Sequence, residues 1–187
     1  MAKPSGFPPI TTPALSDKVV LVQVSGPTDV VLTIQNLLTF IGNNAINNHK
    51  FSVFRTTAFN TPAGTSAKVG FDTHESWDTG TDFDVATNSR YNVPLNGFYD
   101  FNAQVAFNTG GSATVGIIQL YKNGTLYKYG QRIDTAADYI YLVGTWLNIQ
   151  AVVGDYFEIF LYTSAARTGE VNSQAENFFQ GRFTCAT

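Results

Sequence analysis

Charged residues are scarce in this chain. Only 13% of its 187 residues are Asp, Glu, Lys or Arg, whereas proteins average about 25%. The 11 basic residues are scattered and the formal net charge is -3, so the clustered cations that bind nucleic-acid phosphates are lacking. Two interpretations of the low charge remain open. In the first, partners cover much of the surface. In the second, the chain is a β protein that places Thr, Ser, Asn and Gln on its solvent face.

Cysteine and long apolar runs are also nearly absent. Cys185 is the single cysteine, which excludes an intrachain disulfide and a cysteine-based zinc site. We interpret its thiol as a bystander. No apolar run reaches the length that spans a bilayer, and residues 1–10 lack the apolar stretch of a signal peptide. We therefore expect synthesis in a cytosol without export by the general secretory route.

The chain lacks a recognisable catalytic constellation. Its two histidines, His49 and His74, are isolated and have no metal-ligand spacing. No glycine-rich phosphate loop is present, and no pair of carboxylates suggests glycoside hydrolysis. The sequence predicts a protein that is not an enzyme and that has no cofactor.

An acidic segment at residues 72–84 is the one candidate for ion or ligand binding. It holds five carboxylates and Trp77 in what we expect to be a loop. Crowded carboxylates can bind calcium, although the spacing does not fit an EF-hand and a plain solvated loop is the alternative. Trp77 either stacks on a sugar or protein or caps the end of a β-sandwich. The predicted ligand-binding residues are Trp77, Asp78, Asp82 and Asp84.

The first fifty residues have their own organisation. Residues 1–16 carry four prolines, which predicts an extended arm. Residues 17–42 predict a small unit of two short strands and a helix over residues 34–41. Residues 43–50 form an Asn-rich linker.

The small unit at residues 17–42 is too short to bury a core of its own. Its apolar residues therefore need a partner, which is the rest of the chain, another copy or a different protein. We predict that this unit is an attachment element. The residues expected to make the contact are Val20, Val22, Leu37, Leu38 and Ile41.

Strand patterns run from Phe51 to the C-terminus. Residues 99–107 alternate between apolar and polar side chains, which predicts one buried and one polar face. Asn123-Gly124 between two β runs predicts a tight hairpin. Gly154-Asp155 predicts a second tight turn.

The strand from Tyr156 to Tyr162 is apolar on both faces. Antiparallel strands with one solvated face should alternate with polar residues, so the second face must also be covered. A loop of the same chain could cover it, but we favour contact with another subunit. The predicted trimer interface is Tyr156, Phe160 and Tyr162.

These strand patterns resemble the globular head of complement C1q and its tumour-necrosis-factor-like relatives. The resemblance spans residues 51–187 and implies an all-β, ten-strand jelly-roll sandwich that forms a homotrimer and binds partners without catalysis. The segments that carry it are Phe51-Ser-Val-Phe54, Val69-Gly-Phe-Asp72, Tyr91-Asn-Val-Pro-Leu-Asn-Gly-Phe-Tyr-Asp-Phe101, Leu120-Tyr-Lys-Asn-Gly124, Val143-Gly-Thr-Trp-Leu-Asn-Ile-Gln-Ala-Val-Val-Gly-Asp155 and Phe178-Phe-Gln-Gly-Arg-Phe183.

Residues Leu15 to Leu38 resemble N-terminal segments of bacteriophage head- and tail-fibre proteins. Together, the two resemblances imply a trimeric virion structural protein. It would be a capsid decoration, head fibre or tail-fibre head that attaches through its N-terminal segment to other virion proteins and binds a host-surface receptor. The alternative is a bacterial C1q-like soluble module that binds glycan or protein. We expect no nucleic-acid partner and no membrane insertion.

Overall fold

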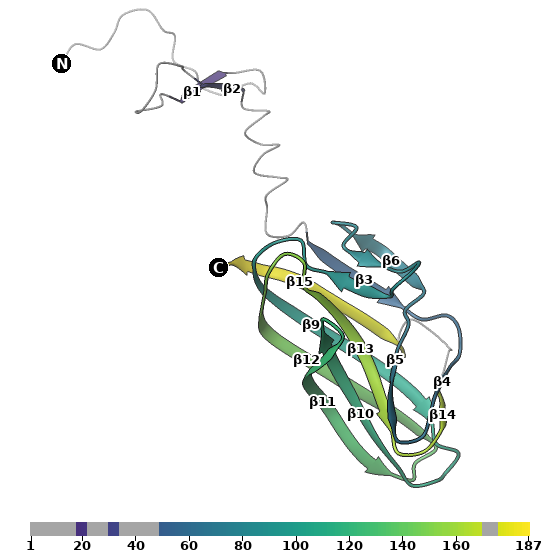
Figure 1. The fold of residues 1–187 in the computed structure, drawn as a ribbon. Coiled ribbons are helices and arrows are strands. Elements are labelled where there is room, and N and C mark those ends of the chain that lie inside the picture. Colours follow the sequence, from purple (N-terminus) through teal and green to yellow (C-terminus); the bar gives the residue numbers. More distant parts are fainter. Residues whose placement is uncertain (1–17, 22–29, 34–48, 170–175) are drawn as a thin grey trace, which may run out of the picture. The chain divides into compact units, whose positions relative to one another are not determined.

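The computed structural model describes residues 18–21, 30–33, 49–169 and 176–187 (Figure 1). The chain separates into two compact units, Met1–Ala45 and Ile46–Thr187. All helix or strand assigned within the described residues is β-strand.

The first unit contains a pair of short antiparallel strands, β1 (Lys18–Leu21) and β2 (Val30–Thr33). Lys18 lies opposite Thr33 and Leu21 opposite Val30, so the predicted strand pairing is confirmed. Of the predicted attachment residues, Val20 lies in β1. The arm at 1–16, the helix at 34–41 and the attachment residues Val22, Leu37, Leu38 and Ile41 lie outside the described residues.

The second unit is a sandwich of two antiparallel sheets (Figure 1). The six-stranded sheet has the order β11-β10-β13-β8-β7, with β5 also paired to β13. Its strands are β5 (Thr65–Lys68), β7 (Phe83–Asp84), β8 (Arg90–Asn92), β10 (Thr114–Lys122), β11 (Thr125–Thr135) and β13 (Tyr156–Thr163).

The seven-stranded sheet has the order β4-β14-β9-β15-β3-β6, with β12 paired to β9. Its strands are β3 (Lys50–Phe54), β4 (Phe59–Thr61), β6 (Thr73–Asp78), β9 (Gly97–Asn108), β12 (Tyr139–Ala151), β14 (Arg167–Gly169) and β15 (Phe178–Ala186). β11 and β12 are both edge strands, and they contact each other at the same side of the sandwich.

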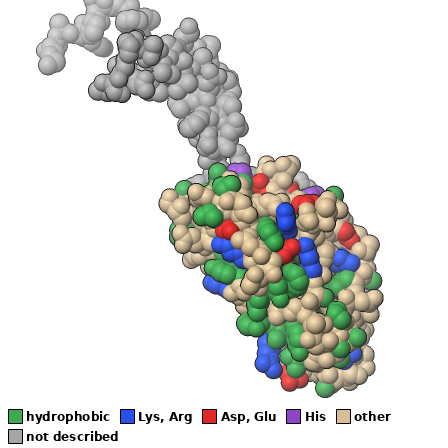
Figure 2. Space-filling model, in the orientation of Figure 1, with side chains coloured by type: hydrophobic (Ala, Val, Ile, Leu, Met, Phe, Trp, Pro, Cys, Tyr) green, Lys and Arg blue, Asp and Glu red, His purple; other side chains and the backbone are tan. Residues whose placement is uncertain are grey.

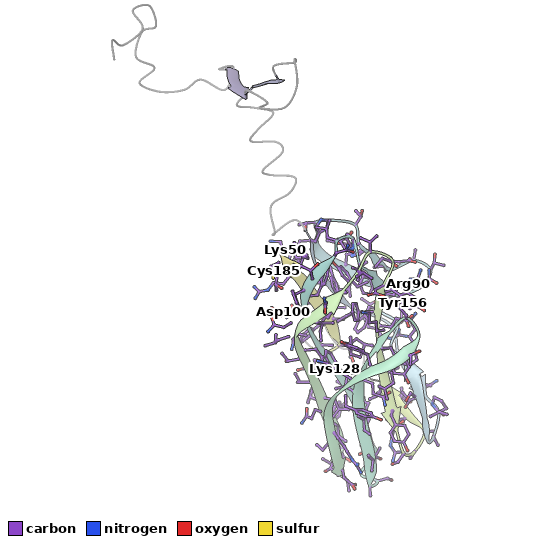
Figure 3. All side chains as sticks on the ribbon, turned by 60° about the vertical axis from the view of Figure 1, so that its left-hand side comes forward. Lys50, Arg90, Asp100, Lys128, Tyr156 and Cys185 are labelled. Carbon is purple, nitrogen blue, oxygen red and sulfur yellow. The ribbon has the colours of Figure 1, made fainter. Side chains whose placement is uncertain are left out.

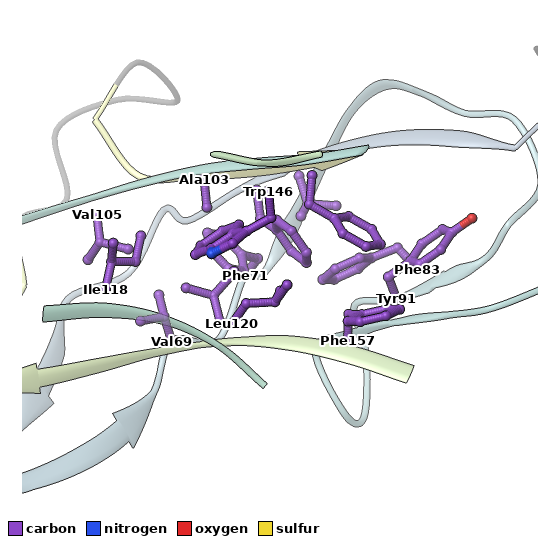
Figure 4. Packing of buried hydrophobic residues seen from close by; sticks show 14 of the residues in the cluster. Val69, Phe71, Phe83, Tyr91, Ala103, Val105, Ile118, Leu120, Trp146 and Phe157 are labelled. Carbon is purple, nitrogen blue, oxygen red and sulfur yellow. The ribbon is translucent and has the colours of Figure 1, made fainter. Parts of the chain in front are cut away.

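The core lies between the sheets and is rich in aromatic rings (Figure 4). The inward side chains of β9 are Tyr99, Phe101, Ala103, Val105 and Phe107, and each is at most 1% exposed. The predicted alternation of this strand is therefore confirmed. Burial of a large apolar side chain contributes about 1.5–3 kcal/mol, so this single strand supplies a substantial part of the driving force for folding.

Ring stacking joins the two sheets. Phe51 on β3 stacks on Tyr91 of β8 with ring centroids 4.6 Å apart. Phe101 on β9 packs against Phe157 of β13 at 4.7 Å. Each pair couples one strand from each sheet, and such pairs contribute about 0.5–1.5 kcal/mol beyond area burial.

The turn at Asn123-Gly124 closes the hairpin between β10 and β11. Lys122 pairs with Thr125, and the two turn residues have φ of 54° and 75°, as a type I′ turn requires. This prediction is confirmed. The second predicted turn is also present, since the amide of Asp155 donates to the carbonyl of Val152 at 3.0 Å. It does not close a hairpin, however, because β12 and β13 lie in opposite sheets.

The acidic segment at residues 72–84 is not the loop that its composition predicts. It contains β6 and β7, and only the short stretch between them turns. β6 pairs with β3, with Val53 opposite His74 and Phe54 opposite Thr73. The backbone pairing available at the edge of the sheet outweighs the polar composition, which by itself favours a loop.

Candidate interaction surfaces

The four aspartates of the acidic segment contact neighbouring groups of the same chain. Asp72 accepts hydrogen bonds from the Thr56 amide at 2.8 Å and the Thr57 hydroxyl at 2.7 Å. Burial alone would raise the pKa of Asp72, but these hydrogen bonds outweigh it and the pKa is lowered. Asp84 accepts from the Thr87 amide at 3.0 Å, and this bond lowers the pKa of Asp84.

Asp78 and Asp82 form a second local arrangement. The carboxylate of Asp78 accepts from the amides of Asp82 and Phe83, both at 3.2 Å. Asp82 Oδ2 lies 2.9 Å from Nδ1 of His49, and burial raises the pKa of Asp82 although the His49 contact opposes it. Among the described residues, no three His, Cys, Asp or Glu side chains come together as a metal site.

Trp77 lies away from these carboxylates, on the outer face of the seven-stranded sheet. It is half-buried and borders a hollow of about 380 Å³. The other lining residues are Lys50, Asp100, Phe101, Asn102, Thr145, Leu147, Gln180, Gly181 and Arg182. None of Asp78, Asp82 and Asp84 lines this hollow, so the structure does not group the four predicted ligand-binding residues into one site.

The charges around the Trp77 hollow are mixed. Lys50 and Asp100 lie on the same side of the head (Figure 3), and Lys50 Nζ is 5.7 Å from the Trp77 ring centroid. Arg182 lies 3.4 Å from Asp100. Asp100 also accepts a hydrogen bond from the Asn148 amide at 3.0 Å. The hollow is therefore an aromatic and polar depression without a strong charge of one sign.

Large apolar side chains are exposed in a row on β12. Tyr139, Tyr141, Val143 and Leu147 are 48%, 46%, 41% and 58% exposed. They point outward from the seven-stranded sheet, and Leu147 also lines the Trp77 hollow. The sequence analysis missed this apolar row of β12. The signal was present in the unbroken apolar run from Tyr139 to Val143, which supplies apolar side chains to both faces of the strand.

The three aromatic residues predicted at the trimer interface lie on the outer face of the other sheet. Each is half-buried in the single chain. Phe160 stacks on Tyr121 with ring centroids 3.8 Å apart, and the Arg90 guanidinium lies 4.3 Å from the ring centroid of Tyr156 (Figure 3). Part of the apolar surface on this face is thus covered within the chain, and its contact with another subunit stays a prediction.

The visible surface of the head is mostly uncharged polar side chain and backbone, with hydrophobic side chains gathered along its middle (Figure 2). The uncharged polar surface agrees with the second interpretation of the low charge, and the cover by partners stays a prediction. None of the described residues forms a helix long and apolar enough to cross a membrane.

Comparison with known proteins finds similarity in fold. No protein-family model matches the chain, and no curated protein sequence matches it. The Eiger TNF of S. frugiperda is 8% identical with a TM-score of 0.55, over 75% of this chain and 95% of that one. Murine APRIL is 12% identical with a TM-score of 0.52, over 72% and 98%.

The globular domain of zebrafish complement 1qA also matches, with 13% identity and a TM-score of 0.48, over 74% of this chain and 99% of that one. At such low identities the similarities to Eiger and APRIL show the fold alone. The fold is the C1q/TNF-like jelly-roll sandwich that the sequence predicts.

Proposed function

We propose that the chain is a non-enzymatic structural protein whose head self-associates into a trimer, and that it is a component of a bacteriophage particle. The observation that carries the proposed self-association is the apolar row of β12. Four large apolar side chains in one line on a strand are unusual for a surface that faces water. Covering them with a second copy removes apolar area from water at about 25 cal/mol per Å².

A threefold contact is heterologous, so the row of one copy meets a different surface of the next. The resemblance of the head to the C1q and TNF families supports three as the number of copies.

The non-enzymatic assignment rests on the lack of a catalytic arrangement in the described part of the chain. His49 is held by Asp82, and His74 Nδ1 lies 3.8 Å from Asp78 Oδ2. Neither histidine is part of a three-residue metal group. General acid–base chemistry needs a titratable group within reach of a bound substrate. Among the described residues, Asp100 is the one carboxylate that lines the hollow beside Trp77, and it is already paired with Arg182.

The test of self-association is sedimentation equilibrium of the wild type and of Tyr141→Asp. We expect a wild-type trimer and a variant that is mostly monomeric, because a carboxylate in the contact would lose its hydration without a partner. Tyr127→Asp is the matched control, since Tyr127 is 42% exposed but lies on β11 outside the row. A monomeric wild type, or equal trimerisation of Tyr141→Asp, would contradict the proposal.

The assignment to a virion rests on the resemblance of residues 15–38 to phage fibre proteins. A truncated chain that begins at Ile46 keeps the whole second compact unit. We expect it to fold and self-associate but to be missing from purified particles. Normal incorporation would place the attachment on the sandwich. Absence of the full chain from particles would favour the soluble glycan- or protein-binding module.

A further inference from the structure

A second hollow lies on the outer face of the six-stranded sheet, and the apolar row of β12 does not reach it. We propose that this hollow binds an acidic saccharide unit. Its volume is about 670 Å³, which is within the range of small-ligand sites. It is lined by three tyrosines, three aliphatic side chains, two hydroxyl residues, one amide and one arginine: Tyr121, Tyr129, Tyr162, Val115, Ile117, Leu126, Thr65, Ser66, Gln119 and Arg132, with Gly64 at the edge.

Strand register places Gln119 between aromatic side chains. Gln119 on β10 lies opposite Tyr129 of β11 on one side and opposite Phe160 of β13 on the other. Two residues along β10, on the same face, Ile117 lies opposite Arg132 and Tyr162. Residues directly opposite each other share one face of a sheet, so the amide, the guanidinium and the tyrosine rings converge from three adjacent strands.

The side chain of Gln119 has an unusual environment for an outward-facing residue. It is only 4% exposed, and its Oε1 is buried with no hydrogen-bond partner among the described residues. An unpaired buried polar group costs about 1–3 kcal/mol, and an apolar residue would avoid this penalty. The terminal torsion of a glutamine is soft, so the amide can turn its oxygen toward a hydroxyl donor that enters the hollow.

Arg132 supplies a cation at one side of the hollow. It is exposed, and no hydrogen bond or ion pair links it to any residue in the described part of the chain. None of the described residues that line the hollow is a carboxylate. Asp134 lies farther along β11 opposite Val115, and on the same sheet face Glu158 is paired with Lys68 at 2.6 Å. The planar guanidinium matches the two oxygens of a carboxylate.

These groups together select a saccharide rather than a purely apolar ligand. Tyrosine rings pack on the C–H faces of a sugar ring, while the hydroxyl groups of Thr65 and Ser66 and the amide of Gln119 exchange hydrogen bonds with sugar hydroxyls. Arg132 then favours a sugar that carries a carboxylate. This hollow and the β12 row lie on opposite sheets. A result that refutes saccharide binding therefore leaves the proposed trimer standing, and a result that refutes the trimer leaves saccharide binding standing.

The experiment compares two sugars that differ in one group. Methyl β-D-glucuronide carries a carboxylate where methyl β-D-glucoside carries a hydroxymethyl group, and N-acetylneuraminic acid serves as a second acidic probe. Binding to the full chain is measured by isothermal titration and NMR line-shape changes at millimolar sugar. We expect an acidic sugar to bind roughly tenfold more tightly than the glucoside, as a charged hydrogen bond would give.

Three variants locate the binding. Arg132→Gln should remove the preference for the acidic sugar. Lys128→Gln, which removes the same charge from the same strand but outside the hollow, should not. Gln119→Leu should weaken binding of every sugar while the melting temperature stays equal or rises, because an unpaired oxygen is removed. A merely structural glutamine would change stability without changing binding.

The proposal is overturned if neither acidic sugar binds the wild type, or if Arg132→Gln binds as the wild type does. It is also overturned if anionic lipid vesicles bind in an Arg132-dependent manner while the sugars do not, because the hollow would then serve a membrane surface. If Tyr141→Asp becomes monomeric and still binds the acidic sugar, the saccharide site is independent of assembly, as its position requires.

Discussion

The indole nitrogen of Trp146 donates a hydrogen bond to the backbone carbonyl of Tyr129 at 3.1 Å. This bond ties the edge strand β12 of one sheet to the edge strand β11 of the other. Two glycines make room for the indole ring. A Cβ on Gly144 would lie 2.0 Å from the Trp146 ring, and a Cβ on Gly130 would lie 2.9 Å from the Cα of Gly144. The exposed row lies on the same strand, β12. The contact between β11 and β12 therefore holds the strand that carries the proposed contact surface.

We expect Trp146→Phe to lower the free energy of unfolding by about 1–3 kcal/mol, because the Tyr129 carbonyl loses its donor. Gly144→Ala should lower it by about 1–3 kcal/mol through overpacking. Urea denaturation measures both. Trp77→Phe is the control, since the half-buried Trp77 has no hydrogen bond to any described residue. Equal stability of Trp146→Phe and the control would show that the two edges are held together by other contacts.

Phe160→Asp distinguishes the two candidate faces for self-association. The sequence pattern of residues 156–162 predicts that this change abolishes the trimer. Our structural proposal places the contact on β12, so we expect Phe160→Asp to remain trimeric but to melt at a lower temperature, because its stacking on Tyr121 is lost. Light scattering and thermal melting measure the two effects. A monomeric Phe160→Asp with a trimeric Tyr141→Asp would return the interface to Tyr156, Phe160 and Tyr162.

Asp155 should make stability depend on pH in the acid range. Its carboxylate contacts Lys122 Nζ at 2.7 Å, Asn123 Nδ2 at 2.7 Å and the Val152 amide at 3.0 Å. Burial acts to raise the pKa of Asp155, but these contacts outweigh it and lower the pKa below the ordinary value of 3.8. The unfolded chain therefore binds a proton before the folded chain does, so the stabilisation is present above pH 3.8 and is lost as the pH falls through the folded pKa.

We expect Asp155→Asn to lower the free energy of unfolding by about 1–3 kcal/mol at neutral pH. The difference from the wild type should shrink progressively as the pH drops from about 5 to below the folded pKa. Denaturation at a series of pH values measures this convergence. A difference that stays constant across the acid range would show that the Asp155 charge does not stabilise the corner between β12 and β13.

Trp77→Ala tests whether the ligand-binding role predicted for the acidic segment belongs to the Trp77 hollow. If the head recognises a host surface through Trp77, binding of labelled protein to cells or to a glycan array should fall at least about tenfold, since stacking on an aromatic ring is lost. The assay is repeated with a calcium chelator. An effect of chelator on the wild type would indicate an ion in this region. Unchanged binding in both conditions would move recognition to another surface.

Local sequence patterns predicted much of the secondary structure correctly. The alternation in β9 predicted its buried residues because side chains in a strand point alternately to opposite faces. Asn123-Gly124 predicted its hairpin because few other residue pairs accept two positive φ angles. Both inferences depend only on residues that are close together in the sequence. By contrast, the turn at Asp155 joins strands of different sheets, because pairing partners of a strand are chosen by long-range contacts.

The sequence alone determined an all-β sandwich with an aromatic core and a poorly charged surface, and its single cysteine excluded an intrachain disulfide. Only the tertiary structure decided which apolar and polar residues meet. It separated Trp77 from Asp78, Asp82 and Asp84, left the apolar row of β12 exposed, and enclosed Gln119 beside Arg132 and three tyrosines. The reason is that periodicity specifies which face of a strand a side chain occupies, whereas register and strand order, set by the packing of the whole sandwich, specify its neighbours.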